Sequence, residues 1–188
     1  MAVMNFVLRQ ATSQDQEAIQ TLIFGVLSEY GLNPDPDGTD ADLQNIGDDS
    51  SFKRGRFDVL VDASGRIVGT VALAQITSTT CELRKMYLAR DVRGNGLGRR
   101  LLDHALDIAR RMGFQRVELE TASVLRRAVA LYERYGFQAC THGHGSCRCD
   151  LAYFLDLNVP PAQAPSPVGL PASPYSFTSR IVLQEATW

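Results

Sequence analysis

The 188-residue chain lacks both a long hydrophobic run and a strong excess of charge. No apolar stretch approaches the roughly 18 residues that a membrane-spanning helix requires, so we expect none. The formal net charge of −2 gives no electrostatic reason to expect binding to nucleic acid or to a membrane surface. The apolar content of 45% is ordinary for a globular protein and indicates one main domain with a normal core.

Cysteine is also scarce, with four residues in the chain. Residues 1–6 contain no basic stretch followed by an apolar segment, so the sequence predicts no signal peptide. Thiols inside a cell are normally kept reduced. We therefore expect a cytoplasmic protein without disulfide bonds.

One short segment, however, concentrates residues that bind zinc. His142, His144, Cys147 and Cys149 fall within eight residues, and imidazole and thiolate are zinc ligands. Their spacing is tighter than in common structural zinc sites, and the glycines between them favour a hairpin loop. We expect no metal here, although zinc remains the alternative.

Hydrophobic periodicity divides residues 6–157 into strands and helices. Antiparallel strands come first, and a strand–helix–strand–helix section follows, which predicts an α/β (α+β) fold with a mixed sheet and helices on both faces. Six prolines between Pro160 and Pro174 mark residues 158–188 as an extended or disordered tail. Strands are expected at residues 6–9, 57–62, 66–73, 82–88, 116–121, 137–141 and 150–157, and helices at 12–30, 39–46, 94–112 and 123–135.

The most informative segment is residues 91–102, in which three glycines alternate before a helical apolar pattern begins. A Gly-rich turn that enters a helix exposes unpaired backbone N–H groups at the positive end of the helix dipole, and such turns bind phosphate. Because Gly94, Gly96 and Gly98 are evenly spaced, the turn matches neither the dinucleotide-binding fingerprint nor the P-loop. The segment predicts a phosphate or pyrophosphate site.

The pattern Arg-x-x-Gly-x-Gly, formed by Arg93, Gly96 and Gly98, resembles the acyl-CoA pyrophosphate loop of the GNAT superfamily of N-acetyltransferases. Upstream, residues 82–88 resemble the family's central strand. Downstream, residues 128–137 are similar to its helix ending in Leu-Tyr-x-x-x-Gly-Phe. The resemblance covers roughly residues 5 to 157. It implies a mostly antiparallel sheet with one splayed pair of parallel strands.

The resemblance also implies acetyl transfer from acetyl-CoA, as cosubstrate, to a primary amine of a small molecule or peptide. The family grips the pyrophosphate with backbone N–H groups of the Gly-rich turn and the pantetheine arm with the central strand. A homodimer is compatible with the family. On this sequence the implied cosubstrate-binding residues are Met86, Tyr87, Leu88, Arg93, Gly94, Asn95, Gly96, Leu97, Gly98 and Arg99.

Two residues are candidates for proton transfer. Tyr132 occupies the tyrosine of the family's helix motif, and a phenol that stays protonated at neutral pH can donate to the leaving thiolate. Glu82, on the central strand, is the first candidate for a general base acting through water. Glu120 on the neighbouring strand, or no dedicated base, are the alternatives. Strand alternation places Glu82, Arg84, Met86 and Leu88 on one face unless a bulge intervenes.

Three further expectations concern the rest of the site. The family often has an asparagine where this chain has Leu125, which puts one contact to the pantetheine arm in doubt. The acceptor pocket is expected around Glu29 and Tyr30 and the acidic loop after them. The excess of carboxylates there favours a cationic amine, and a solvated, helix-capping loop is the alternative. A non-catalytic acyl-CoA-binding module is the competing function.

Overall fold

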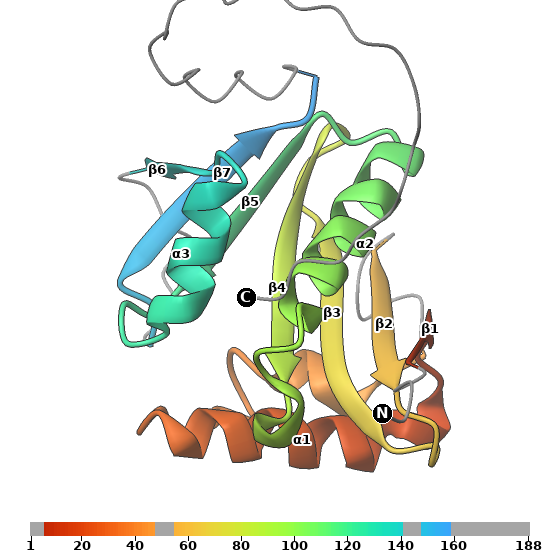
Figure 1. The fold of residues 1–188 in the computed structure, drawn as a ribbon. Coiled ribbons are helices and arrows are strands. Elements are labelled where there is room, and N and C mark those ends of the chain that lie inside the picture. The colour runs from red at the N-terminus through yellow and green to blue at the C-terminus, as the bar shows by residue number, and fades with distance from the viewer. Residues whose placement is uncertain (1–5, 48–54, 141–147, 159–188) are drawn as a thin grey trace, which may run out of the picture.

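The computed structural model describes residues 6–47, 55–140 and 148–158. These residues form a seven-stranded sheet in the order β1-β2-β3-β4-β5-β7-β6, flanked by helices (Figure 1). The strands are β1 (Val7–Gln10), β2 (Arg56–Val61), β3 (Ile67–Gln75), β4 (Thr80–Leu88), β5 (Arg116–Thr121), β6 (Gln138–Cys140) and β7 (Leu151–Asp156). The helices are α1 (Gln16–Glu29), α2 (Leu97–Arg111) and α3 (Arg126–Arg134), with 3-10 helices η1 (Ser13–Asp15), η2 (Ala41–Gln44) and η3 (Arg90–Val92).

The sheet is antiparallel except where β4 lies beside β5. That parallel pair arises because α2 connects the two strands and returns the chain to the same end of the sheet. Figure 1 shows β4 and β5 meeting at one end and separating toward the other. The mixed sheet with a splayed parallel pair, expected from the sequence, is confirmed.

Alternating strand residues divide the core into two layers, one on each face of the sheet. In β2, Leu60 packs in the layer under α2 and α3, whereas Val59 packs in the layer under α1. Leu101 and Leu102 of α2 are fully buried in the first layer, and Ile19 and Ile23 of α1 are fully buried in the second. The apolar stripes that predict these helices are therefore the surfaces that hold them on the sheet.

The clearest difference from expectation lies between α1 and β2. Residues 39–46 were expected to form a helix, but only a short 3-10 helix, η2, forms there. The Asp35 carboxylate accepts a hydrogen bond from the backbone N–H of Thr39 at 2.8 Å, and Asp40 turns toward β4 to pair with Lys85. Such side-chain bonds to local backbone compete with regular helix. The Pro-rich tail beyond residue 158 and the segment containing His142, His144 and Cys147 lie outside the described residues.

We predict that Leu101→Ala lowers the free energy of unfolding by about 2–5 kcal/mol, because it leaves a cavity between α2 and the sheet. Met112→Ala, at a 40% exposed position just after the same helix, should cost less than about 1 kcal/mol. Urea denaturation of both variants measures the difference. Equal losses of unfolding free energy in the two variants would contradict the assignment of Leu101 to the core between α2 and the sheet.

Candidate active site

The Gly-rich turn joins β4 to α2 and is shaped by two left-handed residues. Gly94 has φ 87° and Gly96, the N-cap of α2, has φ 72°, a region that costs side-chain-bearing residues free energy. The helix begins at Leu97, three residues later than the expected start near Gly94. Gly96 has no side chain with which to cap the helix, so the first N–H groups of α2 are available to a ligand.

Arg93, at the start of this turn, points its side chain inward. Its guanidinium donates to the Leu88 carbonyl at 2.9 Å and to the Glu29 carboxylate at 2.7 Å, and it lies 5.7 Å from the ring centre of Tyr30. Its Nη2 is buried and has no hydrogen-bond partner within the described residues. Arg93 therefore ties the end of α1 to the turn, and Glu29, expected at the acceptor pocket, is instead engaged by this cation.

The two parallel strands pair only over the first three of the nine residues of β4. Their register pairs run only from Thr80 with Arg116 to Glu82 with Glu118. Beyond that point β4 continues beside β3 while its other edge leaves β5. Backbone groups on that edge are therefore open to a bound molecule.

A β-bulge in β4 marks the same place. Lys85 has φ 53°, and the register with β3 shifts there. Thr70 Oγ1 donates to the Lys85 carbonyl at 2.7 Å and holds the bulge. The bulge breaks the strict alternation: Leu83 and Met86 both pack in the layer under α2, whereas Arg84 reaches Thr39 on the opposite face. The bulge is the exception that strand alternation allows for, and it places Arg84 and Met86 on different faces.

A cavity of about 490 Å³ fills the opening between the Gly-rich turn, the end of β4, α1 and α3. Seven of its lining residues are ones that the sequence predicts for the cosubstrate site or, in the case of Tyr30, for the acceptor pocket. They are Tyr30, Met86, Tyr87, Leu88, Arg93, Gly94 and Gly98. The cavity is also lined by four residues that the sequence did not indicate: Val26, Arg127, Ala128 and Leu131. The apolar members of that group appear in the sequence only as helix core positions.

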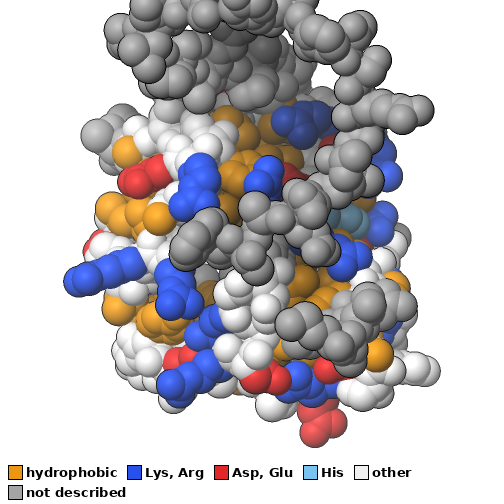
Figure 2. Space-filling view, viewed as in Figure 1, with side chains coloured by type: hydrophobic (Ala, Val, Ile, Leu, Met, Phe, Trp, Pro, Cys, Tyr) orange, Lys and Arg blue, Asp and Glu red, His pale blue; other side chains and the backbone are white. Residues whose placement is uncertain are grey.

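Arginine is prominent on this side of the molecule. Figure 2 shows basic side chains spread over the face that carries α2 and α3. Arg127, in the first turn of α3, lines the cavity. Arg99 is 75% exposed and lies 3.8 Å from Asp103, and Arg100 donates to the Phe6 carbonyl. Of the expected turn arginines, Arg99 thus remains accessible while Arg93 is used inside the protein.

A smaller cavity of about 60 Å³ lies where β4 and β5 diverge, and Tyr132 lines it. The Tyr132 ring is 6% exposed and packs 5.7 Å from Phe137. Its hydroxyl lies 3.9 Å from Met86 Sδ, a weak acceptor. Burial raises the pKa of Tyr132 above its ordinary value, so the phenol keeps its proton. The hydroxyl of Tyr135, at the end of the same helix, instead donates to Asp103 at 2.6 Å on the surface.

The two candidate bases, Glu82 and Glu120, lie at different places in the wedge, which is the opening where β4 and β5 diverge. Glu120 lines the smaller cavity together with Tyr132. Glu82 lies in the paired part of the strands, opposite Glu118, and its carboxylate is 3.6 Å from Arg84 Nε. Glu82 is not among the residues that line the cavity. The geometry therefore favours Glu120 over Glu82 as the general base.

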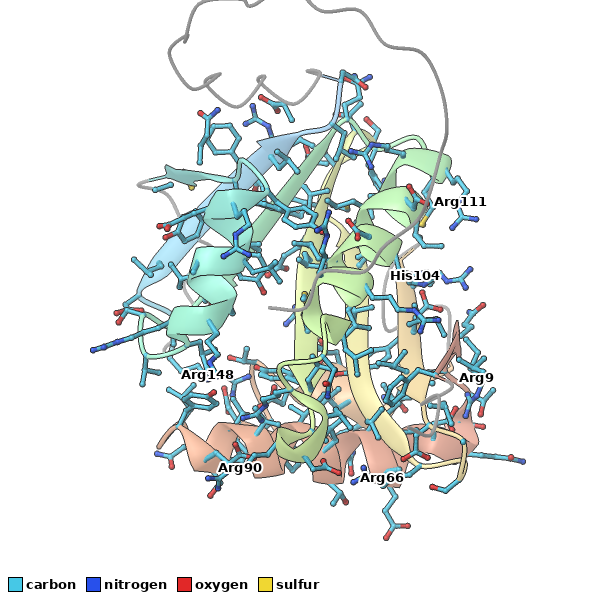
Figure 3. All side chains as sticks on the ribbon, in the orientation of Figure 1. Arg9, Arg66, Arg90, His104, Arg111 and Arg148 are labelled. Carbon is cyan, nitrogen blue, oxygen red and sulfur yellow. The ribbon has the colours of Figure 1, made fainter. Side chains whose placement is uncertain are left out.

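A buried ionic cluster closes the opposite side of the smaller cavity. Asp40 is fully buried and accepts hydrogen bonds from Lys85 Nζ and from two nitrogens of Arg148. Burial of the Asp40 carboxylate opposes ionisation, but the bonds from Arg148 and Lys85 outweigh it and lower its pKa well below the usual range. Figure 3 places Arg148 beside the end of α3, facing α1.

The acidic loop after α1 is therefore largely neutralised. Asp35 accepts from Thr39 within its own turn, and Asp42 lies 3.2 Å from Lys85 and 3.1 Å from Arg84. These contacts support the structural alternative for the loop. The acidic excess does not supply a free anionic wall for a cationic acceptor.

The remaining site expectations concern Leu125 and metal ligands. Leu125 is the N-cap of α3, makes no side-chain capping bond, and lines both cavities. It thus offers an apolar surface at the place where an amide was expected. The described residues contain no cluster of three or more metal-ligating side chains, and Cys149 lines the smaller cavity. Among the helices of the described residues, none has the length and hydropathy of a membrane span.

Comparison with known proteins identifies this architecture. Residues 22–137 match the acetyltransferase (GNAT) family. The chain belongs to the GNAT family of acetyltransferases. It is 40% identical over 152 residues to the N-acetyltransferase YjgM of Escherichia coli K12, which covers 75% of this chain and 90% of that protein.

Solved structures share the fold. A GNAT-family acetyltransferase from Staphylococcus aureus Mu50 superposes with a TM-score of 0.76 at 20% identity, over 81% of this chain and 99% of that one. A spermidine N-acetyltransferase from Vibrio cholerae, in complex with CoA and spermine, superposes with a TM-score of 0.60 at 21% identity, over 81% and 95%. The protein is accordingly an acetyltransferase with the GNAT fold.

We predict that Asp40→Asn lowers the free energy of unfolding by about 3–5 kcal/mol at pH 7, because Lys85 and Arg148 lose a buried counter-charge. The pKa of Asp40 is lower in the folded state than the unfolded value of about 3.9, so its contribution is complete above that pH and is lost as the pH falls. The gap between wild type and variant, measured by urea denaturation, should narrow below about pH 4.

Asp37→Asn, at an exposed position in the same loop, is the matched control and should change stability by less than about 0.5 kcal/mol. A gap of the same size at pH 3 and pH 7 would contradict the ionic role of Asp40.

Proposed function

We propose that this acetyltransferase uses acetyl-CoA as cosubstrate and acetylates a primary amine of a small molecule or peptide. The observation that carries the proposal is the splayed wedge of β4 and β5, which places a cavity lined by the Gly-rich turn next to one lined by Tyr132. Two reactants could thus meet where the two cavities share Met86, Tyr87, Leu125 and Ala128. The structure of the Vibrio cholerae relative contains CoA, which agrees with the cosubstrate.

The residues of the larger cavity fit a long, anionic molecule of this kind. Backbone N–H groups of residues 93–99 would bind the pyrophosphate at the start of α2, and the buried, unpartnered Arg93 Nη2 adds positive charge beside them. The main chain of Met86, Tyr87 and Leu88 would bind the pantetheine amides along the free edge of β4. Exposed Arg99 and Arg127 are placed to meet phosphate oxygens.

Acetyl-CoA supplies an activated thioester, and side chains of the protein would donate and accept the protons. Tyr132 keeps its hydroxyl proton and would donate it to the sulfur that departs from the acetyl group. Glu120 would accept the proton of the attacking ammonium, directly or through water, because it lines the same cavity as Tyr132. Backbone N–H groups of β4 near the bulge would stabilise the carbonyl oxygen as negative charge develops.

We assign this chemistry to a domain of residues 1–157. Its cytoplasmic location and its assembly as a homodimer remain predictions. The competing module that binds acyl-CoA without catalysis is disfavoured, since a protonated, buried tyrosine beside the cavity has a catalytic use.

We predict that Tyr132→Phe lowers kcat by about 10²-fold or more while the Kd of acetyl-CoA changes less than about twofold, because the hydroxyl acts only on the departing sulfur. Thiol release measures turnover, and calorimetry measures the affinity. Tyr135→Phe, with its hydroxyl on the surface, is the control and should leave both values near wild type. An unchanged kcat in Tyr132→Phe would eliminate the acid role.

We predict that Glu120→Gln lowers kcat/KM, measured by thiol release, by about 10²-fold, since the amide cannot accept the amine proton. Glu82→Gln should reduce kcat/KM by less than about threefold, because Glu82 lies in the paired part of the wedge. The reverse order would restore Glu82 as the base. Loss in neither variant would indicate that the amine binds already deprotonated.

A further inference from the structure

On the side of the smaller cavity away from Glu120, three cations face the cavity and the two carboxylates that pair with them lie behind. Arg84, Lys85 and Arg148 line the cavity. Asp40 and Asp42, which pair with them, are 0% and 9% exposed in their side chains and are not among the lining residues. An ion pair oriented in this way presents its positive end to whatever enters the cavity.

Two of the three cations, Lys85 and Arg148, use most of their donors within the protein. Lys85 Nζ has three oxygens around it, from the Thr39 carbonyl at 2.8 Å, from Asp40, and from Asp42 at 3.2 Å. Arg148 grips Asp40 through two nitrogens. These side chains hold the wall together and have little capacity left for a ligand.

Arg84 differs because its donors are poorly used by the described residues. It donates one hydrogen bond, to the Thr39 carbonyl at 3.2 Å. Its nitrogens approach Asp42 to 3.1 Å and Glu82 to 3.6 Å, but neither buried Asp42 oxygen has a hydrogen-bond partner there, so the Asp42 contact lacks hydrogen-bond geometry. With five N–H groups on its guanidinium, Arg84 retains donors for an incoming anion.

We propose that the acceptor carries a carboxylate beside its amine, as an amino acid does, and that Arg84 binds this carboxylate. The inference rests on the proposed acetyl transfer. Arginine and carboxylate match in a planar, two-bond geometry. Because Tyr132 and Glu120 line the same small cavity, a carboxylate held at Arg84 leaves the neighbouring amine beside both. A polyamine has no carboxylate and would leave the remaining Arg84 donors unused.

The test compares acceptors that differ only in the carboxylate. For several side chains, the amino acid, its amide and its decarboxylated amine are assayed by thiol release from acetyl-CoA, for example phenylalanine, phenylalaninamide and phenethylamine, with spermidine alongside. The wild type should show kcat/KM about tenfold or more higher for the carboxylate member of at least one set.

Variants then assign the preference to Arg84. In Arg84→Gln the preference should fall to within about threefold, chiefly through KM, and Arg84→Lys should restore part of it. The affinity for acetyl-CoA, measured by calorimetry, should be unchanged in both. Arg111→Gln, an exposed arginine at the far end of α2, is the matched control (Figure 3).

Amides, decarboxylated amines or spermidine that equal or exceed the amino acids in the wild type would overturn the inference without touching the proposed acetyl transfer. A carboxylate preference that survives intact in Arg84→Gln would overturn the role of Arg84. Binding of acetyl-CoA with no acetylation of any acceptor would defeat the proposed function, and this inference with it.

Discussion

The divergence of β4 from β5 is the constraint on which the rest of the structure depends. The two strands pair over three residues, up to Glu82, and have already separated where a bulge at Lys85 turns β4 further. A continuous parallel ladder would close the edge of β4 and leave no room for either cavity. The divergence therefore converts an ordinary sheet into a sheet with an opening through which two molecules can meet.

Keeping that opening requires free energy, since a bulge residue with positive φ and an unpaired strand edge are both unfavourable. Lys85 connects the bulge to Asp40, and Asp40 connects it to Arg148 at the entry to β7. Three segments far apart in the sequence are thus fixed around one buried carboxylate. Nearer the end of β4, Arg93 joins α1 to the Gly-rich turn through Glu29 and Leu88. Both sides of the wedge are held by side chains that pair within the protein.

Much of this architecture could be predicted from the sequence because it depends on local signals. The strand expected at residues 116–121 is β5, and the Gly-rich turn stands where the change from strand to helix placed it. The buried position of Tyr132 also follows from helical periodicity. Pairing between distant charges could not be predicted in this way. Arg148 lies 108 residues from Asp40, and no local pattern links them.

Two further features of the site depend on contacts that the local sequence does not show. A one-residue insertion reverses which side chains share a face, so Met86 and Arg84 end on opposite sides of the sheet. The acidic loop after α1 appeared to favour a cationic acceptor because its partners were invisible in the sequence. Once Lys85, Arg84 and Arg148 are placed beside Asp40 and Asp42, the same carboxylates instead position cations around the cavity.

Hydrogen–deuterium exchange with and without acetyl-CoA tests most directly whether the wedge is the reaction site. The account predicts that acetyl-CoA slows amide exchange in the second half of β4 and in the Gly-rich turn, because both contribute N–H groups to the bound molecule. Exchange in β1 and at the start of α1 should not change. Slowing confined to other segments, or none at a saturating concentration, would contradict the account.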